Sequence, residues 1–271
     1  MSDLPAQVAT GIALALIFSG AWILWRLVLS PAARAEATPV RLAAWPLSIG
    51  DFLLFLWCVI IGGLAFQIGF GQLLKGYGLS STQRLIFAGA AFQLGMLTGI
   101  LFFRLVLQRR APATPPLVTL HPALSGFATF LVSLPVLTVV SLVWQFLLGL
   151  FGIEAEKQDL IDIFATTKSP ALLAFMILLA TVIAPITEEL LFRWGMFRYA
   201  RTRLPRWLAL LLPACLFGAL HANLASFAPL VALGIIFSLA YERTGRIGTT
   251  MVAHGLFNLN TIVLILCGVT T

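Results

Sequence analysis

Charged residues are scarce in this sequence. The chain of 271 residues holds 17 Lys and Arg and 10 Asp and Glu, so charged residues make up 10% of it, whereas hydrophobic residues make up 60%. Because an average soluble domain is about 25% charged, this composition excludes an ordinary water-soluble globule, a coiled coil and a disordered chain. The mean hydropathy of +1.02 indicates a protein whose solvent is lipid.

Cysteine and the short signatures of several hydrolase classes are also rare or absent. Cys58, Cys215 and Cys267 stand alone within apolar runs, which excludes a disulfide scaffold and gives no support to a thiolate metal site. The sequence contains neither HExxH nor GxSxG, so neither a zincin helix nor a serine nucleophile elbow is indicated. The net charge of +7 raises the question of nucleic acid, but basic cytoplasmic loops account for it in a membrane chain. We therefore expect no nucleic-acid partner.

Long apolar runs are abundant. A helix that spans a bilayer needs about 20 mainly apolar residues, and eight runs qualify. They lie near Val8–Leu29, Phe52–Phe70, Leu85–Leu107, Ala123–Phe151, Ala171–Phe197, Trp207–Ala222, Ser226–Tyr241 and Met251–Gly268. Since a backbone in lipid must satisfy its own hydrogen bonds, we predict an all-α, polytopic bundle of about eight transmembrane helices in the lipid bilayer.

The basic residues divide unevenly between the two sides that eight spans create. Thirteen fall on one side, and only Lys75, Arg84, Lys157 and Lys168 fall on the other. Because cytoplasmic loops carry the excess of Lys and Arg, this division predicts that both termini lie outside the cytoplasm. No organelle address is evident, so we expect a bacterial inner (plasma) membrane.

One proline-rich segment divides the chain. Gln108–Pro122 contains four prolines and resembles a linker. We therefore predict a peripheral group of three transmembrane helices over residues 1–122, and a core of five helices over residues 123–271.

Ionisable residues inside apolar runs are the informative ones, because a charge at mid-bilayer costs about 2.5–3.5 kcal/mol on insertion scales. Glu188 and Glu189 are adjacent, and Arg193 follows Glu189 by one helical turn, which is the favourable order for an ion pair. Two neighbouring carboxylates repel each other in a low dielectric. We therefore predict that Arg193 keeps Glu189 ionised and leaves Glu188 as a proton acceptor.

Two further pairs at helical spacing lie downstream. Phe217 precedes His221 by four residues, and His254 precedes Asn258 by four, so each pair shares a helix face. If these groups converge with Glu188, a carboxylate and a His can activate water, while a second His and an amide stabilise an oxyanion. Alternatively, Glu188, His221 and His254 could hold a divalent metal such as Zn²⁺ with one open position. Spacing alone leaves both chemistries open.

These three motifs resemble a known family. Glu188-Glu189-x-x-x-Arg193, Phe217-x-x-x-His221 and His254-x-x-x-Asn258 are similar to the signature motifs of the CPBP family of intramembrane proteases, which includes the type II CAAX prenyl endopeptidases and the bacteriocin-processing, abortive-infection and immunity-associated proteins. The resemblance covers about Ala171–Gly268 and makes residues 123–271 a CPBP-like core.

The resemblance implies an intramembrane endopeptidase that hydrolyses a peptide bond of a membrane-associated substrate, of which a prenylated CAAX protein is one candidate. It implies that Glu188 and His221 activate water and that His254 and Asn258 stabilise the oxyanion. Glu189, Arg193 and Phe217 would support them. It favours a metal-free glutamate peptidase over a zinc enzyme. Two alternatives stay open, namely a catalytically silent scaffold or immunity protein of the same family and a proton-coupled transporter.

Overall fold

The computed structural model describes residues 4–35, 42–107, 121–153 and 159–269. Every regular element in these ranges is helical, which confirms the all-α prediction. The helices are α1 (Leu4–Leu24), α2 (Pro31–Ala35), α3 (Ile49–Leu73), α4 (Ser81–Phe102), α5 (Pro122–Leu150), α6 (Asp159–Thr166), α7 (Pro170–Leu178), α8 (Ala184–Glu189), α9 (Arg198–Arg201), α10 (Arg206–Leu220), α11 (Leu224–Thr244) and α12 (Ile247–Leu266). Short π- or 3₁₀-helical segments extend or join them, namely η1 (Trp25–Leu29), η2 (Leu74–Gly76), η3 (Phe103–Leu107), η4 (Leu179–Ile183) and η5 (Leu190–Phe197).

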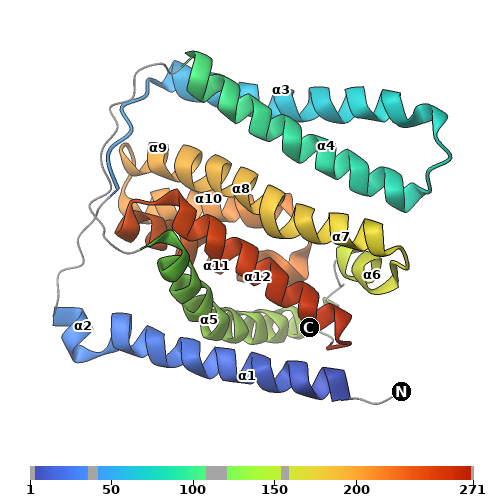
Figure 1. Cartoon of the computed structure of the whole chain (residues 1–271). Helices are drawn as coiled ribbons and strands as arrows, with labels where there is room; N and C mark the ends of the chain where they lie inside the picture. Colours follow the sequence, from blue (N-terminus) through green and yellow to red (C-terminus); the bar gives the residue numbers. More distant parts are fainter. Residues whose placement is uncertain (1–3, 36–41, 108–120, 154–158, 270–271) are drawn as a thin grey trace.

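All eight predicted spans are helical. Within the described ranges, seven spans are long and apolar enough to cross a membrane. The remaining one, α10, has 15 residues and is about 22 Å long at 1.5 Å per residue, which is shorter than a hydrocarbon core of about 30 Å. Helix α1 begins and α12 ends at the same end of the bundle (Figure 1), as an even number of passes requires. The chain is therefore an integral, multi-pass membrane protein.

Two predictions about organisation stay predictions. Residues 108–120 of the predicted linker Gln108–Pro122 lie outside the described residues, whereas His121 caps the start of α5 and Pro122 is its first residue. Four of the basic residues counted also lie outside, namely Arg41, Arg109, Arg110 and Lys157. The division of the chain at residue 122 and the orientation of the termini are therefore carried forward as proposals.

Helices α3 and α4 form a closely crossed pair along one side of the bundle (Figure 1). Their backbones approach so closely that a Cβ on Gly95 would lie 2.2 Å from the carbonyl oxygen of Gly62, and one on Gly99 would lie 2.2 Å from that of Cys58. Small residues four apart allow such an approach in membranes, where dispersion and packing hold helices together. Gly95 and Gly99 thereby fix how α4 is rotated against α3.

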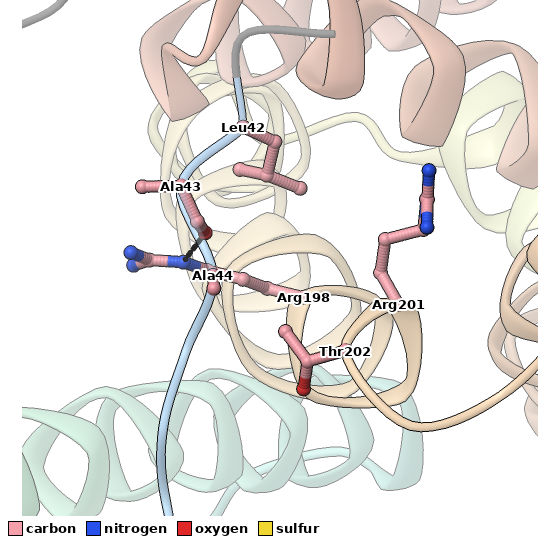
Figure 2. Close-up of a pocket in the computed structure, with 6 residues that line it drawn as sticks. All are labelled: Leu42, Ala43, Ala44, Arg198, Arg201 and Thr202. Atoms are coloured by element: carbon pink, nitrogen blue, oxygen red, sulfur yellow. Dashed lines mark hydrogen bonds between the residues drawn. The ribbon is translucent and has the colours of Figure 1, made fainter.

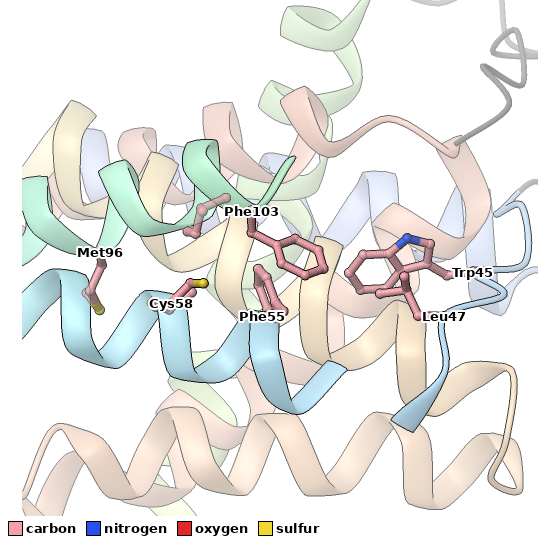
Figure 3. Close-up of a cluster of buried hydrophobic side chains, with 8 residues drawn as sticks. Trp45, Leu47, Phe55, Cys58, Met96 and Phe103 are labelled. Atoms are coloured by element: carbon pink, nitrogen blue, oxygen red, sulfur yellow. The ribbon is translucent and has the colours of Figure 1, made fainter. Parts of the chain in front are cut away.

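An aromatic cluster joins this pair to the rest of the bundle (Figure 3). Trp45 lies in the segment before α3, Phe55 lies on α3, and Phe103 begins η3; all three are buried. The ring of Trp45 lies 4.7 Å from that of Trp194 in η5, and Phe55 packs so closely on Gly195 that a Cβ there would meet its ring at 2.5 Å. The α3–α4 pair is therefore docked on the helical segment that carries Glu188.

The opposite side of the bundle is built by α5, which packs against α1, α11 and α12. Phe130 and Leu134 of α5 form a buried cluster with Leu233 and Phe237 of α11 and Ala253 of α12. Helix α1 lies along the outer side of α5 (Figure 1). The cluster holds α11 and α12 against each other, so it supports the polar groups of α12.

A buried acid anchors the hairpin between α9 and α10. The Glu242 side chain is 2% exposed, and its two carboxylate oxygens accept hydrogen bonds from Arg201 Nε at 2.6 Å and Arg206 Nη2 at 2.7 Å. This three-residue ion pair network fastens the hairpin to the end of α11. Glu242 is not among the ionisable residues predicted to lie inside a span, because it follows the predicted end of the span Ser226–Tyr241 by one residue.

The same hairpin fastens the segment that leads into α3. Arg198 Nε donates to the carbonyl of Ala43 at 3.0 Å, and Arg203 Nη2 donates to that of Leu47. A cavity of about 260 Å³ lies between the segment and the hairpin and is lined by Leu42, Ala43, Ala44, Arg198, Arg201 and Thr202 (Figure 2). Residues far apart in the sequence are thus tied together at the basic end of the bundle.

Candidate active site

The segment from Pro170 to Arg201 is one span made of alternating helix types. The π-helical segments η4 and η5 flank α8, which carries Glu188 and Glu189. Pro185 lies in the first turn of α8 and has no N–H to give to a carbonyl one turn earlier. Departures to π geometry are frequent at functional sites, and here they lie on both sides of the two adjacent carboxylates.

Helix α12 packs directly on this irregular segment. Asn258 Nδ2 donates to the carbonyl oxygen of Ala180 at 2.8 Å, in the region where Pro185 removes a donor. Gly255 allows the approach, because a Cβ at this position would lie 2.5 Å from the carbonyl oxygen of Thr181. Asn258 therefore ties α12 to η4 and retains a second amide hydrogen on Nδ2.

Glu189 and Arg193 form a buried ion pair. Arg193 Nη1 lies 2.8 Å from Glu189 Oε1, and the two side chains are 1% and 0% exposed. The guanidinium carbon of Arg193 lies 4.7 Å from the ring centroid of Phe217 and 5.3 Å from that of Phe237, so aromatic faces enclose the cation. Because both side chains are buried, removing either charge would leave the other without compensation in a low-dielectric environment.

His254 links the two adjacent glutamates. Its Nδ1 lies 3.0 Å from Glu189 Oε1, and its Nε2 lies 3.7 Å from Glu188 Oε2. Glu189 is ionised because it pairs with Arg193, and an ionised carboxylate can only accept hydrogen bonds. Nδ1 of His254 must therefore carry a hydrogen and donate it to Glu189. A neutral imidazole then presents the lone pair of Nε2 to Glu188.

Glu188 is the accessible member of the pair of acids. Its side chain is 17% exposed, whereas Glu189 is fully buried. Gln93 of α4 donates from Nε2 to Glu188 Oε1 at 3.3 Å. Gln93 was not predicted as a site residue. The sequence feature that could have indicated it is a polar amide inside the apolar run Leu85–Leu107.

His221 stands at the end of α10, where it caps the helix. Its Nδ1 lies 2.8 Å from the carbonyl oxygen of Phe217, and the residue is exposed. The ring of Phe217 lies edge-on to both histidines, with centroids 4.8 Å from His221 and 5.9 Å from His254. Among the described contacts, the structure thus joins His254 to Glu188 directly, while His221 lies beside Phe217.

The proposed metal ligands do not form a metal site as arranged. Among the residues that the structure describes, no group of three His, Cys, Asp or Glu side chains is placed to hold a metal ion. The set Glu188, His221 and His254 therefore does not fit a three-ligand zinc centre here.

Taken together, the arrangement provides a partly exposed carboxylate, a histidine of defined tautomer and a buried ion pair that fixes that tautomer. It also provides two side-chain amides, Gln93 and Asn258. A base, an orienting imidazole and nearby hydrogen-bond donors are the parts that hydrolysis requires. The individual roles of Glu188, His221, His254 and Asn258 stay predictions.

Comparison with known proteins points to the same segment. Residues 170–260 match the family described as Type II CAAX prenyl endopeptidase Rce1-like. The chain is 31% identical over 116 residues to the protein named "Putative membrane peptidase YdiL" of Bacillus subtilis, covering 43% of this chain and 46% of the relative. It is 33% identical over 90 residues to "UPF0177 protein YbdI" of Lactococcus lactis, covering 33% and 48%.

The chain thus spans about half the length of the curated relatives it matches. No solved structure matches it. The family match contains all the motif residues from Glu188 to Asn258. The structure adds that His254 contacts both Glu188 and Glu189, and that Glu189 contacts Arg193. Residues 170–260 are thus similar to the Rce1-like type II CAAX prenyl endopeptidases, in agreement with the resemblance of the three motifs to the CPBP family.

Proposed function

We propose that this protein is an intramembrane endopeptidase in which Glu188 is the general base for a water molecule. The observation that carries the proposal is the facing pair of Glu188 Oε2 and His254 Nε2, 3.7 Å apart. Both atoms are hydrogen-bond acceptors when His254 is protonated on Nδ1. A water molecule beside them can donate one hydrogen to each and keep its lone pairs free for a carbonyl carbon.

The proposed reaction follows from this arrangement. The water oxygen bonds to the carbonyl carbon of the scissile peptide while one proton passes to Glu188, so the carbonyl oxygen becomes an oxyanion. Glu188 then returns the proton to the leaving nitrogen as the C–N bond breaks and a carboxylic acid forms. Glu189 and Arg193 keep the imidazole of His254 in its tautomer throughout. General-base assistance of this kind typically contributes about 10²- to 10⁴-fold.

The geometry favours an exchange of the roles that the family resemblance implies for His221 and His254. His254 is the histidine that faces Glu188, which supports a role for it in orienting water. His221 and the second amide hydrogen of Asn258 are then candidates for the oxyanion. Asn258 is already held in place by its hydrogen bond to Ala180, so such a donor would be preorganised.

The proposed substrate is a peptide segment of a membrane-associated protein, with a prenylated CAAX terminus as the first candidate because of the family match. The test is turnover in detergent with a prenylated and an unprenylated CAAX peptide. Wild type is expected to cleave at least one of the two peptides, whereas Glu188→Ala and His221→Ala are expected to lose most activity. Full activity in both variants would contradict the site, and no turnover by the folded wild type on either peptide would favour a silent scaffold.

We also propose that the basic end of the bundle faces the cytoplasm of a bacterial cell and that both termini lie outside. Lys75 and Lys168 are exposed and belong to the minority of basic residues on the opposite side. In a background without native cysteines, Lys75→Cys and Lys168→Cys should react with an impermeant thiol reagent in intact spheroplasts. Labelling only after the membrane is opened would reverse the orientation.

A further inference from the structure

We propose that Gln93 of α4 is a positioning residue for Glu188, so that a helix outside the family-matched segment completes the active site. This inference rests on the proposed function of Glu188 as the base. Residues 170–260 carry the family match, and Gln93 lies 95 residues before Glu188 in the sequence. The peptidase motif would then be complete only when the α3–α4 pair is docked.

The geometry divides the two oxygens of Glu188 between two partners. Gln93 Nε2 donates to Oε1 at 3.3 Å, and Oε2 lies 3.7 Å from His254 Nε2. A carboxylate is planar, so a donor that holds one oxygen also sets the direction of the other. Without the amide, the terminal torsion of Glu188 is free to turn, because such torsions have broad minima. Gln93 therefore aims Oε2 at the place where the water would be activated.

The position of Gln93 is itself fixed by the packing of α4. Gly95 and Gly99 hold α4 against the backbone of α3 at separations that leave no room for a Cβ. The buried cluster of Trp45 and Phe55 then docks the pair onto Trp194, six residues after Glu188. The amide is consequently held on a rigid support rather than on a mobile loop.

A purely structural role for Gln93 accounts poorly for its other polar atom. Gln93 Oε1 is buried and has no hydrogen-bond partner among the described residues. An amide that served only to join two helices would be expected to satisfy both ends, because an unsatisfied buried acceptor is destabilising. An amide whose function is to position Glu188 requires only its NH₂ group at the carboxylate.

The test compares Gln93→Met and Gln93→Glu with wild type in the purified full-length protein, on the peptide that wild type cleaves best. Methionine keeps the length of the side chain and removes the donor, so kcat should fall about 10- to 100-fold, the effect of losing a hydrogen bond to a charged group, with KM within about twofold. Glutamate places a second negative charge beside Glu188, so the acidic limb of the pH–rate profile should move to higher pH.

A control and a parallel variant separate the outcomes. Thr98 is exposed on the same helix, and its hydroxyl donates to the carbonyl oxygen of Leu94 one turn earlier, so Thr98→Val should retain wild-type turnover. Glu188→Gln must abolish turnover, and if it does not, the proposed function fails. If Glu188→Gln is inactive while Gln93→Met keeps its kcat and Gln93→Glu keeps the wild-type pH profile, only the role of Gln93 is overturned. Should Gln93→Met unfold, the pH profile of Gln93→Glu decides alone.

Discussion

Removing the positive charge of Arg193 should destabilise the fold far more than removing an ordinary arginine. Arg193 and Glu189 are 1% and 0% exposed and are joined at 2.8 Å, and His254 shares the same carboxylate oxygen. In Arg193→Met, the carboxylate of Glu189 stays buried and loses its cation. The volume of the side chain is largely kept, so the effect reports the charge rather than a cavity.

The expected magnitude follows from the burial of both partners. Removing one partner of a fully buried ion pair costs about 3–5 kcal/mol, because the other charge is left uncompensated. For a domain of about 150–250 residues, 1 kcal/mol corresponds to about 2–4 °C in Tm, so Arg193→Met should melt about 6–20 °C below wild type. Adding Glu189→Gln to this variant removes the stranded charge, so the double variant should be more stable than Arg193→Met alone.

Thermal unfolding in detergent, followed by tryptophan fluorescence, measures this difference. Arg26 is exposed in η1, so Arg26→Met is the matched control and should lie within about 0.5 kcal/mol of wild type. If Arg193→Met melted together with Arg26→Met, the charge of Arg193 would not stabilise the fold. If adding Glu189→Gln lowered the stability of Arg193→Met further, the unpaired carboxylate would not be the cause of the loss.

Three further variants test other parts of the structure by the same melting assay. Glu242→Gln weakens the pairing with Arg201 and Arg206, which are partly exposed, so it should cost about 1.5–3 kcal/mol; a Tm equal to that of wild type would contradict the anchoring role. Gly99→Leu should lower both Tm and turnover, because its side chain would collide with the backbone of α3; unchanged turnover would argue against α4 as part of the site. Ala222 has a φ of +50°, so Ala222→Gly should stabilise by up to about 1 kcal/mol, and a clear loss of stability would contradict this.

The helical spans could be predicted because apolar run length is a direct physical requirement of the bilayer. All eight runs form helices, and even the short run at Trp207–Ala222 corresponds to α10. The pairing of Glu189 with Arg193 could also be predicted, because four residues bring two side chains to one face of a helix. Both inferences depend only on local geometry.

Contacts between helices could not be predicted in the same way, because they depend on how each helix is rotated about its axis. The bond from Gln93 to Glu188 requires the glycine crossing that orients α4. The contact of His254 with both glutamates requires the approach that Gly255 permits. His221 lies at the end of a short apolar helix that a tight turn follows, and it is exposed beside Phe217. The sequence could not distinguish it from His254, because both histidines belong to residue pairs at a spacing of four.

In the proposed reaction, Glu188 accepts the proton of the attacking water and passes it on to the leaving nitrogen. The most direct measurement is single-turnover cleavage of one membrane peptide by detergent-purified wild type and Glu188→Gln, with products identified by mass spectrometry. The substitution keeps the size of the side chain and the contact to Gln93 while it removes the base. We predict cleavage by wild type and a loss of at least about 100-fold in Glu188→Gln. Cleavage by a folded Glu188→Gln within twofold of the wild-type rate would show that Glu188 is not the base.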